Sequence, residues 1–230
     1  MNYDVEMMKL KRLMRQRKQE KLYEPKPFGS ALRFSRIEKK MTLQEAAEGI
    51  CSISYLSKAE NNLIAVSDQF IEPLSERLGI KRYDDQDDAN YRKDRDRIVD
   101  HLIIGTSLPD DMLAYYGTRK DHQAELVRFG YYMTEQDYGK AFIHFQSVKS
   151  YLLRLDDVEL NLFIYLMHRF LFRHERYDEA HASIRLMDEE TLKDSRMHVL
   201  VVEGRLLCAY RMHMVTEIME LYPKYMKLVV

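Results

Sequence analysis

The sequence is poor in the features that sheet-rich, secreted and membrane proteins need. Its 230 residues include only eight Gly and five Pro, which favours long helices over a sheet of many strands. No stretch approaches about 18 uncharged apolar residues, so we expect no transmembrane helix. The charged N-terminus lacks an apolar segment, so we expect no signal peptide. The two cysteines, Cys51 and Cys208, lie far apart, which predicts a reducing, cytoplasmic location and no disulfide framework.

The sequence also lacks the motifs of common enzymes and metal sites. None of the patterns HExxH, GxSxG, GxGxxG or the P-loop is present. Three of the eight histidines, His168, His174 and His181, are spaced by six and seven residues, but an expected turn at Tyr177-Asp178 separates the last two. We therefore predict no metal site, no cofactor and no enzymatic activity.

Charge is distributed unevenly along the chain. Hydrophobic residues make up 46% and charged residues 32%, a balance typical of a soluble helical protein, and the net charge is −1. Residues 1–82 hold 16 Lys+Arg and 11 Asp+Glu, a net charge of +5, which leaves 20 and 26, a net charge of −6, for residues 83–230. This asymmetry is typical of a nucleic-acid-binding domain joined to a partner-binding domain. The alternative is chance, because an excess of five charges is modest.

The stretch from Thr42 to Asn62 has the pattern of two short helices joined by a tight turn. Thr42 is a good N-cap, and Glu45 three residues on completes a capping box. Gly49 can adopt the positive φ of the turn that follows. Ser52 can then cap a second helix, Ile53 to Glu60, which Asn61-Asn62 would end. Such a pair predicts a helix-turn-helix, whose second helix enters the DNA major groove.

This stretch resembles the Xre-type helix-turn-helix. The residues that carry the resemblance are Arg36, Thr42, Glu45, Ala47, Gly49-Ile50-Cys51-Ser52, Ser54-Tyr55-Leu56-Ser57-Lys58 and Glu60-Asn61. The run GICS…SYLSK…EN is similar to the DNA-binding domain of the Rgg/PlcR group, peptide-responsive quorum-sensing regulators of Gram-positive bacteria. The resemblance spans roughly residues 28 to 80. It implies an all-α protein with a lambda-repressor-like domain, followed by tetratricopeptide-like helices.

The resemblance and the helix pattern together give a set of expected DNA contacts. These are Thr42, Gln44, Ser52, Ile53, Ser54, Tyr55, Ser57 and Lys58. Ser52 to Tyr55 and Lys58 lie at the start and on the exposed side of the second helix, where hydroxyl and ammonium groups can reach bases or phosphates. The resemblance also implies a buried ion pair between Arg36 and Glu60. The alternative is that the helix-turn-helix is purely structural, within a helical interaction or dimerisation protein.

Four segments follow from these patterns. Residues 1–27 form a basic extension, with Lys9, Lys11, Arg12, Arg15, Arg17, Lys18 and Lys21 close together; it is either an arm that touches DNA phosphates or a solvated helix. Residues 28–82 form the DNA-binding domain, with further helices at Gly29–Lys40 and at Asp68–Leu78. Ser67 and Gly79 bound the latter helix. Residues 83–109 are a linker and a connecting helix, and residues 110–230 a helical repeat domain.

The last segment contains a weak internal repeat. Tyr138, Ala141 and Phe145 recur 39 residues later as Tyr177, Ala180 and Ile184, and each set follows a long apolar helix pattern. A small Ala lets two antiparallel helices approach closely, which is typical of a tetratricopeptide-like hairpin. A third hairpin, over residues 195–222, lacks this Ala. We expect a stack of three hairpins.

The function of this stack has two readings. In the helix around Asn161, Tyr165 and His168 lie four and seven residues on, so all three share one face. Neighbouring apolar positions suit the packing seam better, which leaves these three for an open groove. One reading, implied by the resemblance, is a receptor for a signalling peptide, with Asn161 pairing to the peptide backbone. The other is a dimerisation or protein-partner module. In both readings we expect a homodimer that binds double-stranded DNA and no membrane.

Overall fold

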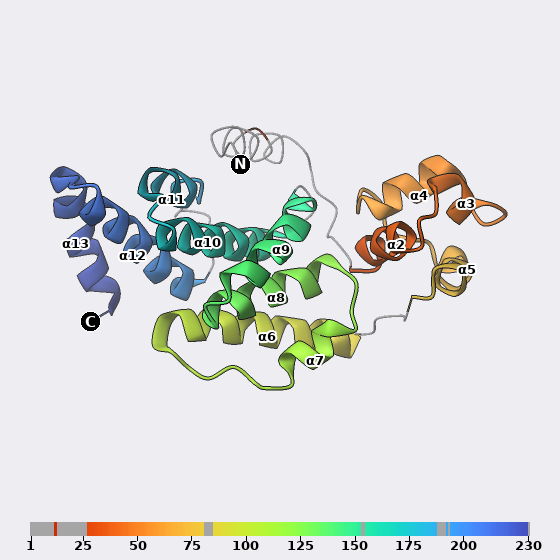
Figure 1. Cartoon of the computed structure of the whole chain (residues 1–230), viewed down its shortest axis with the longest axis horizontal. Coiled ribbons are helices and arrows are strands. Elements are labelled where there is room, and N and C mark those ends of the chain that lie inside the picture. The colour runs from red at the N-terminus through yellow and green to blue at the C-terminus, as the bar shows by residue number, and fades with distance from the viewer. Residues whose placement is uncertain are drawn as a thin grey trace.

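The part of the chain described by the computed structural model comprises Arg12, residues 27–80, 85–152 and 155–187, Leu192, and residues 194–229. Within these residues the structure is all-α, with twelve helices and no strand, as the sequence predicted (Figure 1). The basic extension, residues 1–27, lies outside the described residues apart from Arg12 and Pro27. The helices separate into a small N-terminal group and a larger group with its own apolar core.

The N-terminal group contains four helices: α2 (Pro27–Glu38), α3 (Leu43–Ala47), α4 (Ile53–Glu60) and α5 (Asp68–Leu78). α4 and α5 have the bounds expected from their flanking residues. α2 begins and ends two residues earlier than the expected helix Gly29–Lys40. Its first residue is Pro27, and proline suits the first turn of a helix, where its missing N–H has no helical partner. Leu32, Leu56 and Leu74 fill the small core and are fully buried.

Eight helices form the larger group. They are α6 (Asp85–Ile104), α7 (Met112–Gly117), α8 (His122–Thr134), α9 (Tyr138–Lys149), α10 (Asp157–Arg173), α11 (Tyr177–Ile184), α12 (Ser195–Arg211) and α13 (Val215–Val229). Three helical hairpins, α8–α9, α10–α11 and α12–α13, account for most of them (Figure 1).

A shared turn closes each of the three hairpins. Gln136, Glu175 and His213 each adopt a positive φ, of 59°, 58° and 56°, two residues before the second helix begins. Ala141 and Ala180 are fully buried where the paired helices approach. The third hairpin therefore repeats the turn of the first two, although it lacks the small residue.

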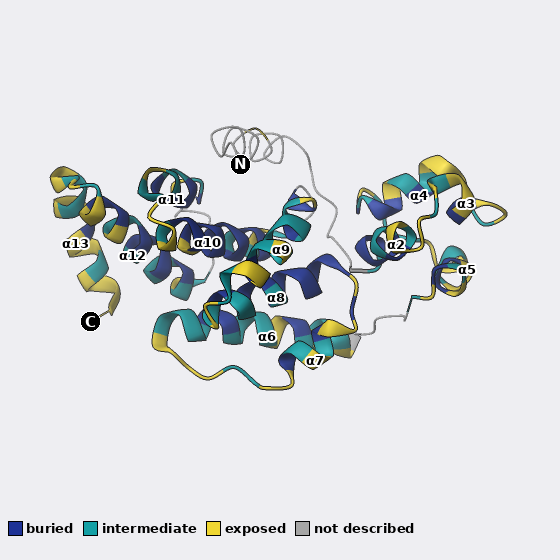
Figure 2. Cartoon of the chain, in the orientation of Figure 1, coloured by how far each residue is buried: buried dark blue, intermediate teal, exposed yellow. Residues whose placement is uncertain are grey.

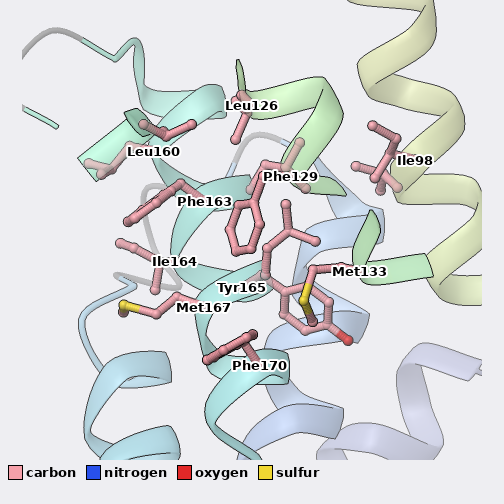
Figure 3. Close-up of a cluster of buried hydrophobic side chains, with 14 of the residues drawn as sticks. Ile98, Leu126, Phe129, Met133, Leu160, Phe163, Ile164, Tyr165, Met167 and Phe170 are labelled. Carbon is pink, nitrogen blue, oxygen red and sulfur yellow. The ribbon is translucent and has the colours of Figure 1, made fainter. Parts of the chain in front are cut away.

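α6 packs as part of the helical stack. It contacts both α8 and α12, and α10 also contacts those two helices, so the four surround a common interior. Ile98 of α6 is fully buried, and a Cβ added at Gly130 of α8 would lie 2.9 Å from its Cδ1, so glycine permits this close approach. Figure 3 shows the core in which Phe129 of α8 meets Phe163 of α10, with ring centroids 6.0 Å apart.

Candidate nucleic-acid interface and ligand hollow

A two-armed ion pair joins α2 to the end of α4. Arg36 Nε and Nη2 donate to the two carboxylate oxygens of Glu60 at 2.6 and 2.7 Å. Arg36 Nη1 also donates to the backbone carbonyl of Met41 at 2.9 Å. The side chain of Glu60 is only 4% exposed. This pair, at the positions expected for it, holds α4 against α2 within the N-terminal group of four helices, which we call the module.

Local capping sets the two helices of the motif. Thr42 Oγ1 accepts the N–H of Glu45 at 3.2 Å, and the Glu45 carboxylate accepts the N–H of Thr42 at 2.6 Å, which completes a capping box. Ser52 Oγ accepts the N–H of Tyr55 at 3.1 Å at the start of α4. Gly49 has a φ of 70° in the turn between them. Arg77 of α5 donates to backbone carbonyls at the end of α3, including that of Ala46 at 3.3 Å.

Most of the expected DNA contacts lie together on the surface. Ser52, Ile53, Ser54 and Lys58 are exposed at the start and along one side of α4, and Thr42 and Gln44 are exposed at the start of α3. Ile53 is 48% exposed. Ser57 is half-buried.

Tyr55 does not belong with these exposed residues. Its ring packs edge-on against Phe70 of α5, with centroids 4.8 Å apart. Its hydroxyl accepts the N–H of Ser67 at 2.7 Å and donates to Ser67 Oγ at 3.2 Å. The expectation that Tyr55 reads bases is therefore corrected: the hydroxyl finds its partners within the module. The same contact explains why Ser67 makes no side-chain cap on α5.

The charge of the described module differs from that of the whole N-terminal third. Residues 27–80 hold 6 Lys+Arg and 7 Asp+Glu, a net charge of −1. Residues 1–26 hold 8 and 4, a net charge of +4, so the positive charge of this third lies mainly in the basic extension. Residues 27–80 therefore carry no excess of positive charge.

A buried chain of polar groups connects the module to the helical stack. Ser30 of α2 lies with its Oγ 2.8 Å from Nδ1 of His122 and accepts the N–H of His122 at 3.1 Å. Nε2 of His122 lies 3.4 Å from the Glu159 carboxylate, which also accepts the hydroxyl proton of Tyr91 at 2.9 Å. All four residues are at most 3% exposed. We call these four residues the joint, because they link α2 to α8, α10 and α6.

The electrostatics of the joint favour a charged pair. Burial alone lowers the pKa of His122, but the neighbouring Glu159 carboxylate outweighs it, and the pKa of His122 is raised. Burial raises the pKa of Glu159, but His122 outweighs this, and the pKa of Glu159 is lowered. The two groups therefore stabilise each other in their ionised forms.

Two further contacts support the joint at the same interface. The ring of Phe34 in α2 stacks on Tyr151, with centroids 5.2 Å apart. Glu38, at the end of α2, forms an exposed ion pair with Lys120. Ser30, Phe34 and Glu38 follow one another at steps of four residues and so lie along one side of α2. That side of α2 makes the contacts described here between the module and the stack.

The surface of the stack contains a partly open hollow of about 450 Å³. α6, α8, α9, α10 and α12 and the α8–α9 turn contribute to its wall, which includes His101, Leu102, Met133, Thr134, Gln136, Tyr138, Tyr165, His168, Arg169, Phe172, Arg173, Gly204 and Leu207. Arg169 and Arg173 are exposed, one turn apart on α10, as is Gln136. A mixed apolar and cationic wall of this size suits part of a peptide or another small anionic ligand.

The three expected groove residues do not share one open face. Tyr165 and His168 are each 1% exposed, whereas Asn161 is half-buried and not part of the wall of the hollow. His168 Nδ1 lies 3.1 Å from the carbonyl oxygen of Ala180. On the other side of its ring, a Cβ added at Gly204 would lie 2.7 Å from Nε2. The expected open groove is therefore corrected to a wall in which Tyr165 and His168 are packed.

The residues at the rim of the hollow were missed by sequence reasoning. His101, Gln136 and Tyr138 come from two helices and a turn that no pattern in the sequence links. The spacing of Arg169 and Arg173, four residues apart, could have predicted a cationic surface here, because it puts both side chains on one helix face. Burial lowers the pKa of His168 to about 4, so its ring is neutral at neutral pH, and the arginines supply the positive charge of the wall.

No group of three or more His, Cys, Asp or Glu side chains in the described part is placed to hold a metal ion. Of the helices the structure describes, none has the length and apolar content to cross a membrane.

Comparison with known proteins gives one likeness. No protein-family description matches the chain. No curated protein matches it either. Among solved structures it is similar to PlcR of Bacillus thuringiensis, crystallised in complex with the peptide PapR7 and DNA, with 14% identity, over 88% of this chain and 79% of that chain, at a TM-score of 0.47.

Proposed function

We propose that this chain is a sequence-specific DNA-binding transcriptional regulator of the cytoplasm. The observation that carries the proposal is the exposed start of α4. Ser52, Ser54 and Lys58 are exposed at the start and along one side of a helix that Arg36 and Glu60 hold in place. An exposed helix start held by a rigid scaffold is what reading a major groove requires.

Each exposed group has a chemical role in this proposal. The hydroxyl groups of Ser52 and Ser54 can donate to or accept from base edges, and Lys58 can reach guanine or a phosphate. Gln44, exposed at the start of α3, would donate to a phosphate of the same half-site. The basic extension would add contacts to phosphates. A homodimer would then occupy two half-sites about one helical turn apart.

The stack would control this binding through a ligand in the hollow. His122 begins α8 and Glu159 lies in the first turn of α10, whereas the opposite ends of the same helices line the hollow. A ligand that shifts either helix would therefore act on the joint and on α2. The apolar and cationic wall favours a peptide with a carboxylate, which Arg169 and Arg173 can pair with.

One observation favours a different function. Residues 27–80 have a net charge of −1, whereas DNA-binding domains usually present a basic surface. In the alternative, the module binds another protein through the exposed face of α4, and the whole chain is a helical interaction protein. The two functions predict opposite results in a DNA-binding experiment.

Selection from a random duplex library with the full-length protein tests the proposal. We expect an enriched palindrome whose affinity falls steeply with salt, since each phosphate neutralised adds about −0.9 to the log–log slope. Lys58→Ala should relax the preference at one position of each half-site or weaken binding at least several-fold. Lys93→Ala is the matched control, because Lys93 is exposed on α6, away from α4. No enrichment, or equal loss in both variants, would support the interaction protein.

A further inference from the structure

The wall of the hollow carries positive charge that no acid of the wall offsets. Most of α10 is buried (Figure 2), but its two arginines in the wall, Arg169 and Arg173, are exposed. Among the described residues that line the hollow there is no Asp or Glu. Glu203 of α12 acts electrostatically on Arg169, but it lies outside the wall, and in the described part of the chain no ion pair joins the two. The hollow therefore favours an anionic group in its ligand.

Only one of the two ring nitrogens of His168 has a partner. Nδ1 lies 3.1 Å from the carbonyl oxygen of Ala180, and because a carbonyl can only accept, Nδ1 carries the proton. Burial lowers the pKa of His168 to about 4, so at neutral pH the ring is uncharged and Nε2 carries no proton. No described residue donates a hydrogen bond to Nε2. His168 is 1% exposed, and a buried acceptor without a donor is uncommon in folded proteins.

Nε2 of His168 lies beside Gly204, and both residues line the hollow. A Cβ added at Gly204 would lie 2.7 Å from Nε2, 3.2 Å from Cδ2 and 3.4 Å from Cε1, so the ring turns its Nε2 edge toward this glycine. With glycine, only hydrogen atoms lie in front of that edge, whereas any larger residue would cover it. Glycine at position 204 therefore leaves the acceptor next to the space of the hollow.

Apolar side chains from four helices complete this wall. They are Leu102 of α6, Met133 of α8, Phe172 of α10 and Leu207 of α12. The ring of Phe172 lies against that of His168, with centroids 6.1 Å apart. The hollow therefore combines an apolar surface, one fixed acceptor and two cationic groups. The last residue of a peptide carries the three matching groups close together: an apolar side chain, a backbone N–H and a carboxylate.

We propose that the hollow binds the C-terminal residue of a peptide, and that His168 selects this residue by accepting its backbone N–H at Nε2. Arg169 and Arg173 pair with the carboxylate, and the apolar wall surrounds the side chain. The N–H and the carboxylate are joined through one carbon atom, so a ligand that lacks either group loses part of the match. This inference rests on the proposed function, which gives the hollow a peptide with a carboxylate, and adds the residue that discriminates among such ligands.

Three small probes that differ in one group test this selection with the full-length protein. N-acetyl-L-leucine carries the carboxylate, the N–H and an apolar side chain. (S)-2-acetoxy-4-methylpentanoate has an ester oxygen in place of the N–H, and N-acetyl-L-leucinamide has an amide in place of the carboxylate. NMR titration of the methyl groups of Leu102, Met133 and Leu207 measures each dissociation constant. We expect a constant on the order of 1 mM for N-acetyl-L-leucine and binding about three- to tenfold weaker for each analogue.

Variants of the wall assign each preference to its residue. His168→Phe keeps an aromatic ring but removes Nε2, so the preference for the N–H over the ester oxygen should disappear, whatever the stability of the variant. Gly204→Ala places a methyl group against Nε2 and should weaken binding of N-acetyl-L-leucine at least threefold. Arg169→Gln/Arg173→Gln should abolish the preference for the carboxylate. Arg92→Gln, which changes an exposed arginine on α6 outside the wall, is the control and should keep both preferences.

The outcomes separate this inference from the proposed function. Equal binding of N-acetyl-L-leucine and its ester, or a preference for the N–H that persists in His168→Phe, would overturn the role of His168. A carboxylate preference that depends on the two arginines would in that case leave the ligand of the proposed function standing. No saturable shift of the three methyl resonances with any probe would overturn both the selection by His168 and the ligand of the proposed function.

Discussion

The hydroxyl of Ser30 in α2 and the imidazole of His122 in α8 lie 2.8 Å apart, although 92 residues separate them in the chain. Ser30 also accepts the backbone N–H of His122, so one small side chain satisfies two groups of a buried residue. Both residues are fully buried. This contact makes the position of α2 depend on the position of α8.

Ser30→Ala should loosen the contact between the module and the stack. The change leaves the N–H of His122 buried without its acceptor, which costs about 1–3 kcal/mol of unfolding free energy. Urea unfolding followed by tyrosine fluorescence and by circular dichroism measures the loss. Ser107→Ala, at an exposed position between α6 and α7, is the control and should change stability by less than about 0.5 kcal/mol. Equal stability of the two variants would contradict the role of Ser30.

The buried pair of His122 and Glu159 should make stability fall at alkaline pH. The pKa of His122 is raised in the folded state, so its contribution is complete below the unfolded pKa of about 6.5 and is lost as pH rises through the folded value. The pKa of Glu159 is lowered, so its contribution is complete above an unfolded value of about 4.3 and is lost in stronger acid. Unfolding at pH 6, 7 and 8.5 should therefore show decreasing stability. Glu159→Gln should flatten this trend; an unchanged slope would show that other groups cause it.

Titration of His168 should make the free energy of unfolding rise with pH, in a pH range below the one in which His122 makes it fall. Its folded pKa of about 4 lies below the unfolded value of about 6.5, because burial disfavours the imidazolium. The unfolded chain therefore binds more protons between these values, and stability should rise as pH increases from 4 to 6.5. The variant His168→Gln should show a shallower rise over this range. Titration of His168 by NMR near pH 6.5 in the folded protein would refute the prediction.

Arg36→Met should destabilise the N-terminal module strongly. The change leaves the buried carboxylate of Glu60 without its partner, which costs about 3–5 kcal/mol. Differential scanning calorimetry should show a clearly lower melting temperature. Lys39→Met removes a neighbouring exposed charge from the surface and serves as the control. A melting temperature unchanged in Arg36→Met would show that the ion pair contributes little.

Tyr55→Phe separates packing from base reading. The variant keeps the ring on Phe70 but removes the hydroxyl that Ser67 uses, so we expect a loss of about 1 kcal/mol in unfolding free energy. The DNA sequence preference should stay the same, because the hydroxyl points into the module. A changed preference with unchanged stability would return Tyr55 to the DNA contacts.

Much of the secondary structure could be predicted because its signals are local. Ser52 and Asn61 bound α4, and Ser67 and Gly79 bound α5, at the positions that capping chemistry predicts. Tyr138 and Ala141 recur 39 residues later as Tyr177 and Ala180, and this repeat predicted two hairpins that the structure contains. The signal is local because the small residue at each helix crossing lies close in sequence to the turn.

The spacing of residues along a helix shows which of them share a face, and the sequence therefore predicted that Asn161, Tyr165 and His168 lie on one face of α10. It does not say how many neighbours cover that face. α10 contacts α8, α9, α11 and α12, so Tyr165 and His168 are packed where an isolated hairpin would expose them. In the same way, Tyr55 packs toward α5, where its ring contacts Phe70 and its hydroxyl accepts the N–H of Ser67. Capping and helix periodicity act within a few residues, so the sequence alone set the helices; the joint between Ser30 and His122 depends on contacts across 92 residues, which only the tertiary structure decided.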